Sequence, residues 1–171
     1  MNKIETKRLI IRPLTYKMAE TLLNDRKSFN EKFNIDLHPN WPLEAIKKKL
    51  DNYKEYIRDN FEEVKWGIWI MINKGDKKVI GDLGFKGKPN EEGIIEVGYS
   101  IVENYRGFGY ANEGVKALIN WALEDKRVNK IIAQCNENNI PSIRLLKRVG
   151  MDNVGMKDNM LQWQMYRKRQ K

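Results

Sequence analysis

The stretch ENYRGFGYANEG, residues 103–114, places Arg106, Gly107 and Gly109 directly before a segment with helical periodicity. The backbone amides of a glycine-rich turn and the unpaired first amides of a helix converge at such a place, and the helix dipole adds partial positive charge. Glycine lets a bulky phosphate approach the backbone, and an arginine adds a charge-assisted hydrogen bond. The stretch therefore predicts a site for a phosphate-bearing ligand, with an ordinary turn as the alternative.

This turn does not match the two best-defined nucleotide motifs. It lacks the Gly-Lys-Ser/Thr ending of a Walker loop, and it lacks the third glycine and the following acidic residue of a dinucleotide fingerprint. We therefore expect neither ATP nor NAD at this turn.

A carboxylate stands inside a strand-like run at residues 93–102, GIIEVGYSIV. Strand alternation places Glu96 on the same face as Gly98 and Ser100. In that position Glu96 could accept a proton from an ammonium group, directly or through water. It could equally lie on a solvated strand face, paired with a lysine of the neighbouring strand.

The chain has a single cysteine, Cys135, and a single histidine, His38, nearly a hundred residues apart. This arrangement excludes an internal disulfide and offers no metal-ligand spacing, so we expect no bound metal. Cys135 falls in a predicted buried strand without a neighbouring histidine, which indicates a core residue. His38 could deprotonate an amine, but a role in a turn is the stronger interpretation. Trp41 could line an acceptor groove or belong to an aromatic core.

The elements that must position these residues alternate between strand and helix. Turn residues separate three central strands, which indicates an antiparallel meander. The order predicts a mixed α/β (α+β) domain in which helices flank a sheet. Apolar periodicity predicts a strand at residues 8–14, helices at 15–25 and 38–61, strands at 65–72, 78–87 and 93–102, a helix at 111–126, a strand at 130–135, a helix at 141–150 and a strand at 161–166.

Length and composition limit the class of protein. With 171 residues, 41% of them hydrophobic and 32% charged, the chain fits a single globular domain over residues 1–171. No apolar run approaches the roughly 20 residues that span a bilayer, and the charged start MNKIETKRLIIRPL does not resemble a signal peptide. We therefore expect a soluble cytoplasmic protein without a membrane partner.

The formal net charge of +9 calls for an anionic partner, which could be nucleic acid, an anionic cofactor or an anionic surface. Part of the excess lies in the last residues, YRKRQK, which are expected to form a solvated tail. In the predicted helix at 38–61, lysines share the surface with acidic residues, without the basic face typical of nucleic-acid binders. Nucleic acid is therefore the weaker alternative.

Several of these motifs together resemble the GNAT superfamily of acyl-CoA-dependent N-acyltransferases. RGFGYA fits its Arg/Gln-x-x-Gly-x-Gly/Ala loop, EVGYSI resembles its fourth strand, and KIIAQCNENNIPSIRLLKRVGM resembles the strand, Asn-x-x-Ser turn and helix that follow. IETKRLIIRPLT is similar to the amino-terminal strand of the branch that contains the ribosomal-protein N-terminal (Rim-type) acetyltransferases and relatives acting on small amines. The resemblance covers nearly the whole chain, with its specific motifs at about residues 94–151.

This resemblance implies a GNAT-like sheet, mostly antiparallel, whose fourth strand splays from its neighbour and pairs with the pantetheine of acetyl-CoA. The pyrophosphate is expected on the backbone amides of residues 106–111. The implied cofactor-binding residues are Ser100, Ile101, Val102, Arg106, Gly107, Phe108, Gly109, Tyr110, Ala111, Asn139 and Ser142.

The resemblance also implies how an acetyl group would pass to a primary amine by direct attack in a ternary complex. The backbone amide of Ile101 or Ser100 would stabilise the oxyanion, and Glu96 would act as the base. Many relatives protonate the leaving thiolate with a tyrosine after the fourth helix, but here Met151 stands where an aromatic residue is usual. Ser142 is the matching substitute, although it could instead cap its helix.

The acceptor amine is left open, because fold and cofactor site do not determine the substrate. A protein N-terminus, a polyamine, an amino sugar and an amino acid all remain possible acceptors. Asn139 would either bond pantetheine or stabilise its turn. A protein that binds acyl-CoA as a sensor without transfer is a further alternative. We expect a monomer or a homodimer.

Overall fold

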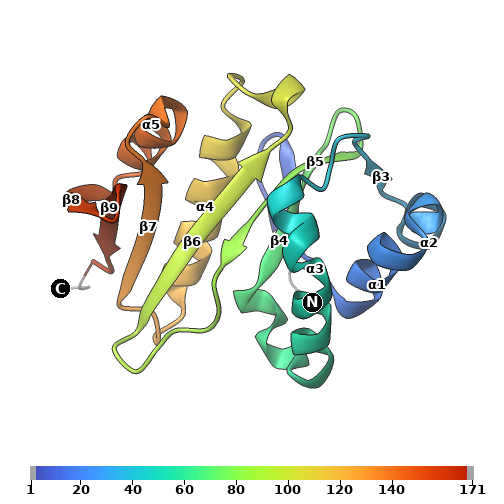
Figure 1. Cartoon of the computed structure of the whole chain (residues 1–171), viewed down its shortest axis with the longest axis horizontal. Helices are drawn as coiled ribbons and strands as arrows, with labels where there is room; N and C mark the ends of the chain where they lie inside the picture. The colour runs from blue at the N-terminus through green and yellow to red at the C-terminus, as the bar shows by residue number, and fades with distance from the viewer. Residues whose placement is uncertain (1–2, 169–171) are drawn as a thin grey trace.

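The structure, a computed structural model, describes residues 3–168. Within these residues the strands form a nine-stranded sheet in the order β1-β2-β4-β5-β6-β7-β9-β8, with β3 paired to β5 outside this path (Figure 1). Residues 169–171, the end of the predicted basic tail, lie outside the described residues. The strands are β1 (Ile4–Glu5), β2 (Leu9–Pro13), β3 (Asp36–Leu37), β4 (Ile68–Asn73), β5 (Lys78–Phe85), β6 (Ile94–Ile101), β7 (Lys130–Asn136), β8 (Asp152–Lys157) and β9 (Met160–Tyr166).

Helices cover both faces of this sheet. Figure 1 shows α4 behind the sheet and α3 in front of it, and α1 packs against α3. The pairs β2–β4, β4–β5 and β5–β6 are antiparallel, which confirms the predicted meander and the mixed α/β class. The α-helices are α1 (Tyr16–Asn24), α2 (Phe29–Phe33), α3 (Glu44–Asp59), α4 (Tyr110–Glu124) and α5 (Ile140–Arg148), and the 3-10 helices are η1 (Arg26–Ser28), η2 (Phe61–Trp66) and η3 (Glu103–Tyr105).

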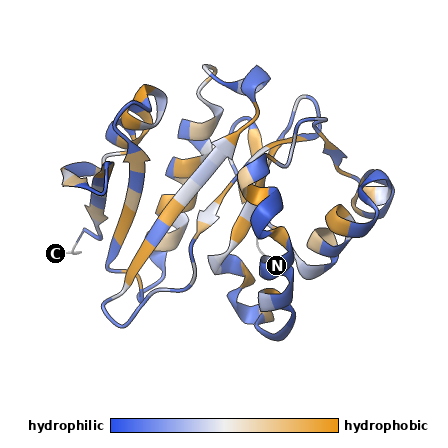
Figure 2. Cartoon of the chain, viewed as in Figure 1, coloured by the Kyte–Doolittle hydropathy of each residue, from blue (hydrophilic) through white to orange (hydrophobic). Residues whose placement is uncertain are grey.

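The apolar faces predicted from periodicity are the buried ones. Figure 2 shows apolar residues concentrated on the strands and hydrophilic residues on outer helices and turns. In α4, glycine at position 114 lets the helix lie close to the sheet, because a Cβ there would come within 2.8 Å of the Met71 sulfur. As predicted, α4 buries Val115, Leu118, Ile119 and Ala122.

The second predicted helix starts later than expected. α3 begins at Glu44, whereas residues 38–43 form a loop. The sequence HPNWP explains the difference, because a residue that precedes proline is disfavoured in the helical region. Arg26 holds this loop by donating to the carbonyls of His38 and Trp41 at 3.0 and 2.7 Å.

Several short or exposed elements gave no periodic signal. α2 has five residues and β3 has two, which is too short for a hydrophobic pattern. β8 is exposed along its whole length, so it carries no alternation of apolar and polar residues. Among the described residues no helix is both long and apolar enough to cross a bilayer.

β6 changes partners along its length, and this change creates the main opening of the fold. It pairs antiparallel with β5 as far as Ile101, but pairs parallel with β7 only at Ile94, Ile95 and Glu96. Beyond Ile132, β7 continues its antiparallel pairing with β9 but no longer pairs with β6. From this point β6 and β7 diverge (Figure 1). This is the splay of the fourth strand that the resemblance implied.

We expect Gly81→Ala to lower the free energy of unfolding by about 1–3 kcal/mol, because overpacking would push the paired backbone apart. Gly81 pairs with Ile101, and a Cβ on Gly81 would lie 2.4 Å from the carbonyl oxygen of Ser100. Urea unfolding followed by circular dichroism measures the effect. Gly98→Ala on the partner strand is the matched control, since a Cβ there meets no described heavy atom within 4 Å. Equal losses in both variants would contradict this assignment.

Candidate active site

A cavity of about 650 Å³ opens where β6 and β7 diverge. Its walls are the carboxyl end of β6, the turn before α4, the first turn of α4 and one side of α5 as far as its last residue, Arg148. Two residues expected here do not line it: Val102 is fully buried in the core, and Phe108 is 65% exposed. The other predicted cofactor residues all line the cavity: Ser100, Ile101, Arg106, Gly107, Gly109, Tyr110, Ala111, Asn139 and Ser142.

The glycines of the turn are required by its backbone. Gly107 and Gly109 have φ angles of 82° and 81°, in the left-handed region that favours glycine, and Gly109 is the residue that precedes the first turn of α4. The first amides of α4, beginning at Tyr110 and Ala111, have no carbonyl partner within the helix. The sequence left open whether these glycines serve a turn or an anion site. The structure allows both, because the glycines shape the turn and the free amides are available to an anion.

Arg8 fixes the turn from outside the cavity, a role that the sequence pattern did not predict. Its guanidinium donates to the Phe108 carbonyl at 2.8 Å, pairs with Glu113 at 2.7 Å and stacks on the Tyr110 ring at 4.3 Å. These contacts join the residue that precedes β2 to the turn and to the first turn of α4. The loop is thus held in shape by the protein alone.

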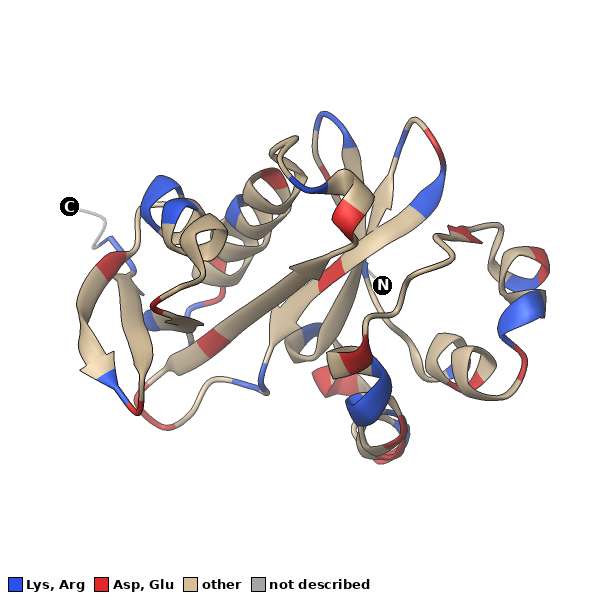
Figure 3. Cartoon of the chain, turned by 45° about the horizontal axis from the view of Figure 1, so that its top comes forward, with Lys and Arg blue, Asp and Glu red and all other residues tan. Residues whose placement is uncertain are grey.

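The cavity has a positive lining. Arg106, Arg144 and Arg148 line it, and no acidic side chain of the described residues does so. Figure 3 shows the basic residues that α5 contributes. Sequence reasoning named only Arg106, although the spacing of four between Arg144 and Arg148 puts both on one face of a helix. This lining favours an anionic ligand.

The strand register leaves backbone groups of β6 unpaired in the cavity. Val102 donates to the Ile80 carbonyl at 2.9 Å, so the even-numbered residues of β6 exchange hydrogen bonds with β5. The odd-numbered residues therefore turn their amides and carbonyls toward β7, whose pairing ends at Glu96. The amides of Tyr99 and Ile101 thus face the gap without a partner among the described strands.

This register corrects the expectation for Ser100. Its amide is turned toward Asp82 of β5, so of the two amides considered for the oxyanion only that of Ile101 faces the gap. The side chain of Ser100 also points to β5, where its hydroxyl donates to Asp82 Oδ2 at 2.8 Å. Ser100 nevertheless lines the cavity, so it links the cavity to the strand behind it.

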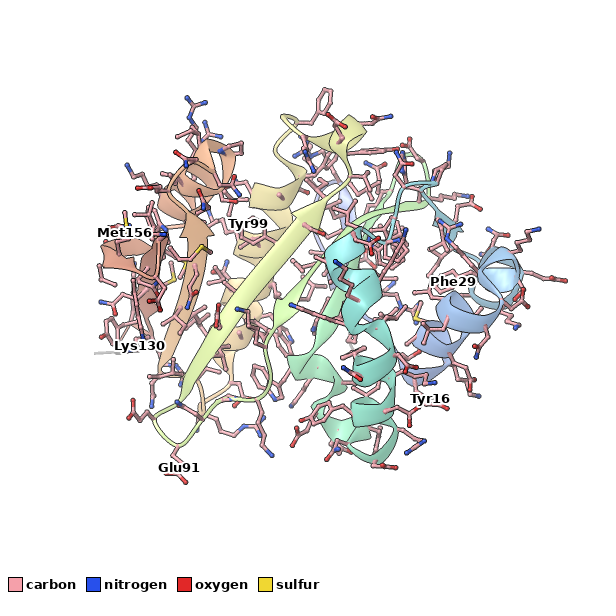
Figure 4. All side chains as sticks on the ribbon, in the orientation of Figure 1. Tyr16, Phe29, Glu91, Tyr99, Lys130 and Met156 are labelled. Carbon is pink, nitrogen blue, oxygen red and sulfur yellow. The ribbon has the colours of Figure 1, made fainter. Side chains whose placement is uncertain are left out.

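Tyr99 brings a buried hydroxyl into the gap. Figure 4 shows its side chain projecting from β6 toward the space between β6 and β7. The hydroxyl makes no hydrogen bond to any described residue. Burial raises the pKa of Tyr99, and the nearby Ser142 hydroxyl partly offsets this effect. A buried polar atom without a partner is expected to find one in a ligand. Cys135, 5% exposed, lies in the core as predicted.

Asn139 rather than Ser142 caps α5. The Asn139 side-chain oxygen accepts from the amide of Ser142 at 3.2 Å. The turn-stabilising role considered for Asn139 is therefore present in the structure, while both residues also line the cavity.

Glu96 lies apart from the cavity. It occupies the last position at which β6 pairs with β7, and its carboxylate forms an ion pair with Lys86. Its side chain is 18% exposed and is not part of the cavity lining. Of the two interpretations left open by the sequence, the ion pair with a neighbouring lysine is the arrangement found here.

Asp82 is a buried carboxylate that sequence reasoning missed. It is 3% exposed, and its Oδ2 accepts from Trp41 Nε1 at 2.9 Å and from the Ser100 hydroxyl. Burial raises the pKa of Asp82 to about 6, against the opposite effect of these two hydrogen bonds. The sequence feature that could have pointed to Asp82 is an acidic residue within the otherwise mostly apolar strand KVIGDLGF. Trp41, 1% exposed, belongs to the core rather than to an open groove.

His38 has the turn role that the sequence favoured. Its Nδ1 accepts from the amide of Asn40 at 3.2 Å, and its ring meets the Tyr105 ring edge-on, with centroids 5.7 Å apart. Within residues 3–168 no group of three or more His, Cys, Asp or Glu side chains could hold a metal ion.

Known N-acetyltransferases resemble the chain in sequence and in fold. The family described as Acetyltransferase (GNAT) domain matches residues 8–152. The uncharacterized N-acetyltransferase YjdG of Bacillus subtilis (strain 168) is 26% identical over 147 residues, which cover 86% of this chain and 88% of that protein.

Solved acetyltransferases share the fold at low identity. The ribosomal-protein-S5-alanine acetyltransferase from Vibrio fischeri superposes with a TM-score of 0.68 at 18% identity, covering 98% of this chain and 97% of that one. RimL, a ribosomal L7/L12 alpha-N-protein acetyltransferase in complex with coenzyme A, superposes with a TM-score of 0.66 at 13% identity, covering 96% and 98%. At these identities the likeness establishes the fold alone.

The raised pKa of Asp82 predicts a pH-dependent stability. The carboxyl has a pKa of about 6 when folded and about 3.9 when unfolded, so between these values the folded state binds its proton more tightly. The natural chain should therefore lose stability as the pH rises through this window, and Asp82→Asn should not.

The difference in free energy of unfolding between Asp82→Asn and the natural chain should accordingly grow by about 3 kcal/mol from about pH 4 to about pH 7. Urea unfolding at a series of pH values measures it. Asp51→Asn, on the exposed surface of α3, is the control and should show no such change. A difference that stays constant with pH would contradict the prediction.

Proposed function

The chain belongs to the acetyltransferase (GNAT) family, and from this premise we propose that it transfers an acetyl group from acetyl-CoA to a primary amine. The amine attacks directly in a ternary complex, and the chain acts as a single catalytic domain. The observation that carries the proposal is the cavity at the β6–β7 gap, where unpaired strand amides, a glycine turn and arginines meet.

The cavity suits a long ligand with phosphates at one end. The turn at Gly107 and Gly109 and the first amides of α4 offer donors to a pyrophosphate. Arg106, Arg144 and Arg148 supply the matching positive charge. The unpaired groups of β6 can bond an extended amide chain as a neighbouring strand would. When bound, acetyl-CoA supplies an acetyl group activated as a thioester.

The amide of Ile101 is the proposed donor to the negative charge that develops on the thioester oxygen. It belongs to a strand that β5 holds in place, so it needs no rearrangement during the reaction. A preorganised donor of this kind contributes about 3 kcal/mol to transition-state stabilisation. The Tyr99 amide, turned the same way two residues earlier, can share this role or bond the chain of the ligand.

Ser142 is the proposed proton donor to the departing sulfur, and its hydroxyl regains the proton that the attacking nitrogen releases as the amide forms. It lines the cavity beside the buried Tyr99 hydroxyl. Because Asn139 already caps α5, the Ser142 hydroxyl is not needed for that purpose. A serine donor is needed because Met151 stands where many relatives have the tyrosine that protonates the thiolate.

The proposed acceptor is a protein N-terminus or a small primary amine. Structural neighbours named as ribosomal-protein acetyltransferases support the first choice. The net charge of +9 disfavours a strongly cationic acceptor such as a polyamine. The competing function is an acyl-CoA sensor that binds without transfer.

Labelled acetyl-CoA added to size-fractionated cell extract, with and without the protein, tests this function. Label in a protein or ribosome fraction would identify a protein N-acetyltransferase, and label in small molecules would identify a metabolite or drug amine as acceptor. Binding of acetyl-CoA without label in any fraction would favour the sensor. Absence of binding would overturn the proposal.

We expect Arg144→Gln to weaken the binding of coenzyme A by about tenfold, because it removes a charge-assisted hydrogen bond. Isothermal titration calorimetry with coenzyme A measures the affinity. Arg58→Gln on α3, outside the cavity lining, is the control and should bind normally. Normal affinity in both variants would remove Arg144 from the site.

We expect Ser142→Ala to lower kcat by about 100-fold with little change in KM for acetyl-CoA, since a proton donor acts in the transition state. Release of the coenzyme A thiol, with hydroxylamine as a generic acceptor, measures the rate. Ser142→Thr keeps a hydroxyl and should retain most activity. An unchanged kcat in the alanine variant would exclude Ser142 as the donor.

A further inference from the structure

A buried polar cluster lies behind the cavity, on the face of the sheet opposite α4. It consists of Asp82 on β5, Ser100 on β6 and Trp41 in the loop before α3, joined by the two hydrogen bonds to Asp82 Oδ2. Asp82 and Trp41 are closed to solvent, whereas Ser100 lines the cavity. The Ser100 hydroxyl therefore connects a buried carboxylate with the place where an acceptor would react.

We propose that Asp82, acting through the Ser100 hydroxyl, takes the proton from the acceptor ammonium before the amine attacks. This inference rests on the proposed acetyl transfer and assigns the base of that reaction. Ser100 contacts the amine, and Asp82 acts through Ser100.

Position along β6 puts Ser100 close to the reacting atoms. Ser100 stands between Tyr99 and Ile101, the residues whose unpaired amides face the gap, and neighbouring Cα atoms are about 3.8 Å apart. Its hydroxyl lies on the opposite face of the strand from the Tyr99 side chain. An amine approaching from the Asp82 side thus meets Ser100 first.

The approach on that side is open at Gly98. This residue shares the face of Ser100, and a Cβ there would meet no described heavy atom within 4 Å. Glu96 lies one step further along the same face, but its carboxylate is held in the ion pair with Lys86. Of these three residues, Ser100 is the one that lines the cavity.

The surroundings of Asp82 contain no competing ion pair. Across the sheet it faces Ile70 on β4 and Ser100 on β6, and the loop contributes the Trp41 indole. In the same row, Arg12 on β2 pairs with Ile70, so its backbone lies two strands from that of Asp82, and no ion pair joins the two described side chains. Within the described residues the carboxylate is thus held by neutral donors, which leave it able to accept a proton.

The proton transfer balances without another reactant. The N–H bond of the ammonium breaks as its proton passes to Ser100 Oγ, while the O–H bond of Ser100 breaks as that proton passes to Asp82 Oδ2. The products are a neutral amine, an intact serine and a protonated Asp82, which later returns its proton to solvent. The neutral amine then has the lone pair that attack on the thioester requires.

The environment of Asp82 suits this task. Burial raises the pKa of Asp82 to about 6, which makes it a stronger base than an exposed aspartate and keeps it ionised at neutral pH. The α-amino group of a peptide, with a pKa of about 8, is closer to this value than an alkyl amine with a pKa of about 10. A peptide N-terminus is therefore the acceptor best matched to this base.

A series of small amines shows whether Asp82 acts as a base or only links the Trp41 loop to the sheet. Hydroxylamine is mostly unprotonated at neutral pH and needs no base, whereas glycinamide and ethylamine are protonated and need one. We expect Asp82→Asn and Ser100→Ala each to lower kcat/KM for glycinamide and ethylamine by about 100-fold and to change that for hydroxylamine by no more than about twofold. Asp51→Asn is the control, and calorimetry should give unchanged affinity for acetyl-CoA in Asp82→Asn and in Asp51→Asn.

Trp41→Phe supplies a test that keeps the carboxylate. It removes a hydrogen bond that lowers the pKa of Asp82, so the acid limb of the pH profile of kcat/KM for glycinamide should move to higher pH. In Asp82→Asn this limb should disappear, and the rate should instead rise with pH until the amine itself loses its proton.

Each other result would overturn the inference. Equal losses for hydroxylamine and ethylamine in Asp82→Asn would make the cluster structural, and an unmoved acid limb in Trp41→Phe would do the same. A selective loss of the protonated amines in Glu96→Gln or His38→Gln, with Asp82→Asn active, would give the role to that residue. Absence of transfer to any amine, hydroxylamine included, would overturn the proposed function itself, and this inference with it.

Discussion

The end of hydrogen bonding between β6 and β7 at Glu96 and Ile132 is the constraint on which the rest of the structure depends. β6 remains hydrogen-bonded to β5, and β7 remains hydrogen-bonded to β9. Both parts of the sheet therefore keep a paired strand on each side of the gap. Unpaired strand amides are costly unless something bonds them, and here they face a cavity rather than the core. The opening therefore offers a ligand hydrogen-bonding groups that belong to the backbone, whatever side chains surround them.

The two faces of β6 divide the proposed chemistry. Its odd-numbered residues direct amides into the gap, where Tyr99 and Ile101 can hold the acyl donor. Its even-numbered residues carry side chains toward the face opposite α4, where Ser100 meets Asp82. Because strand alternation enforces this separation, a group that holds the thioester and a group that receives the acceptor's proton can come from adjacent residues.

The glycine turn, where we propose that the pyrophosphate binds, is held in place by contacts within the protein. Gly107 and Gly109 supply the backbone angles, Arg8 ties the turn to β2, and arginines of two different elements face the same space. A loop that is already ordered loses less conformational entropy on binding.

Local pattern in the sequence determined the long elements, the antiparallel meander, the glycine turn with Arg106, and the placement of Asn139 and Ser142 at the start of a helix, because each depends on neighbours in the chain. The short α2 and β3 escaped it because they are too short to show a hydrophobic period, and α3 starts late because of the prolines before it. The contacts of Arg8 escaped it because they depend on residues about a hundred positions away. Only the tertiary structure decided that Glu96 is held by Lys86, that the Ser100 amide is turned away, and that Asp82 meets Ser100. Strand register and burial decide such roles, and both arise from pairing between segments that the sequence keeps apart.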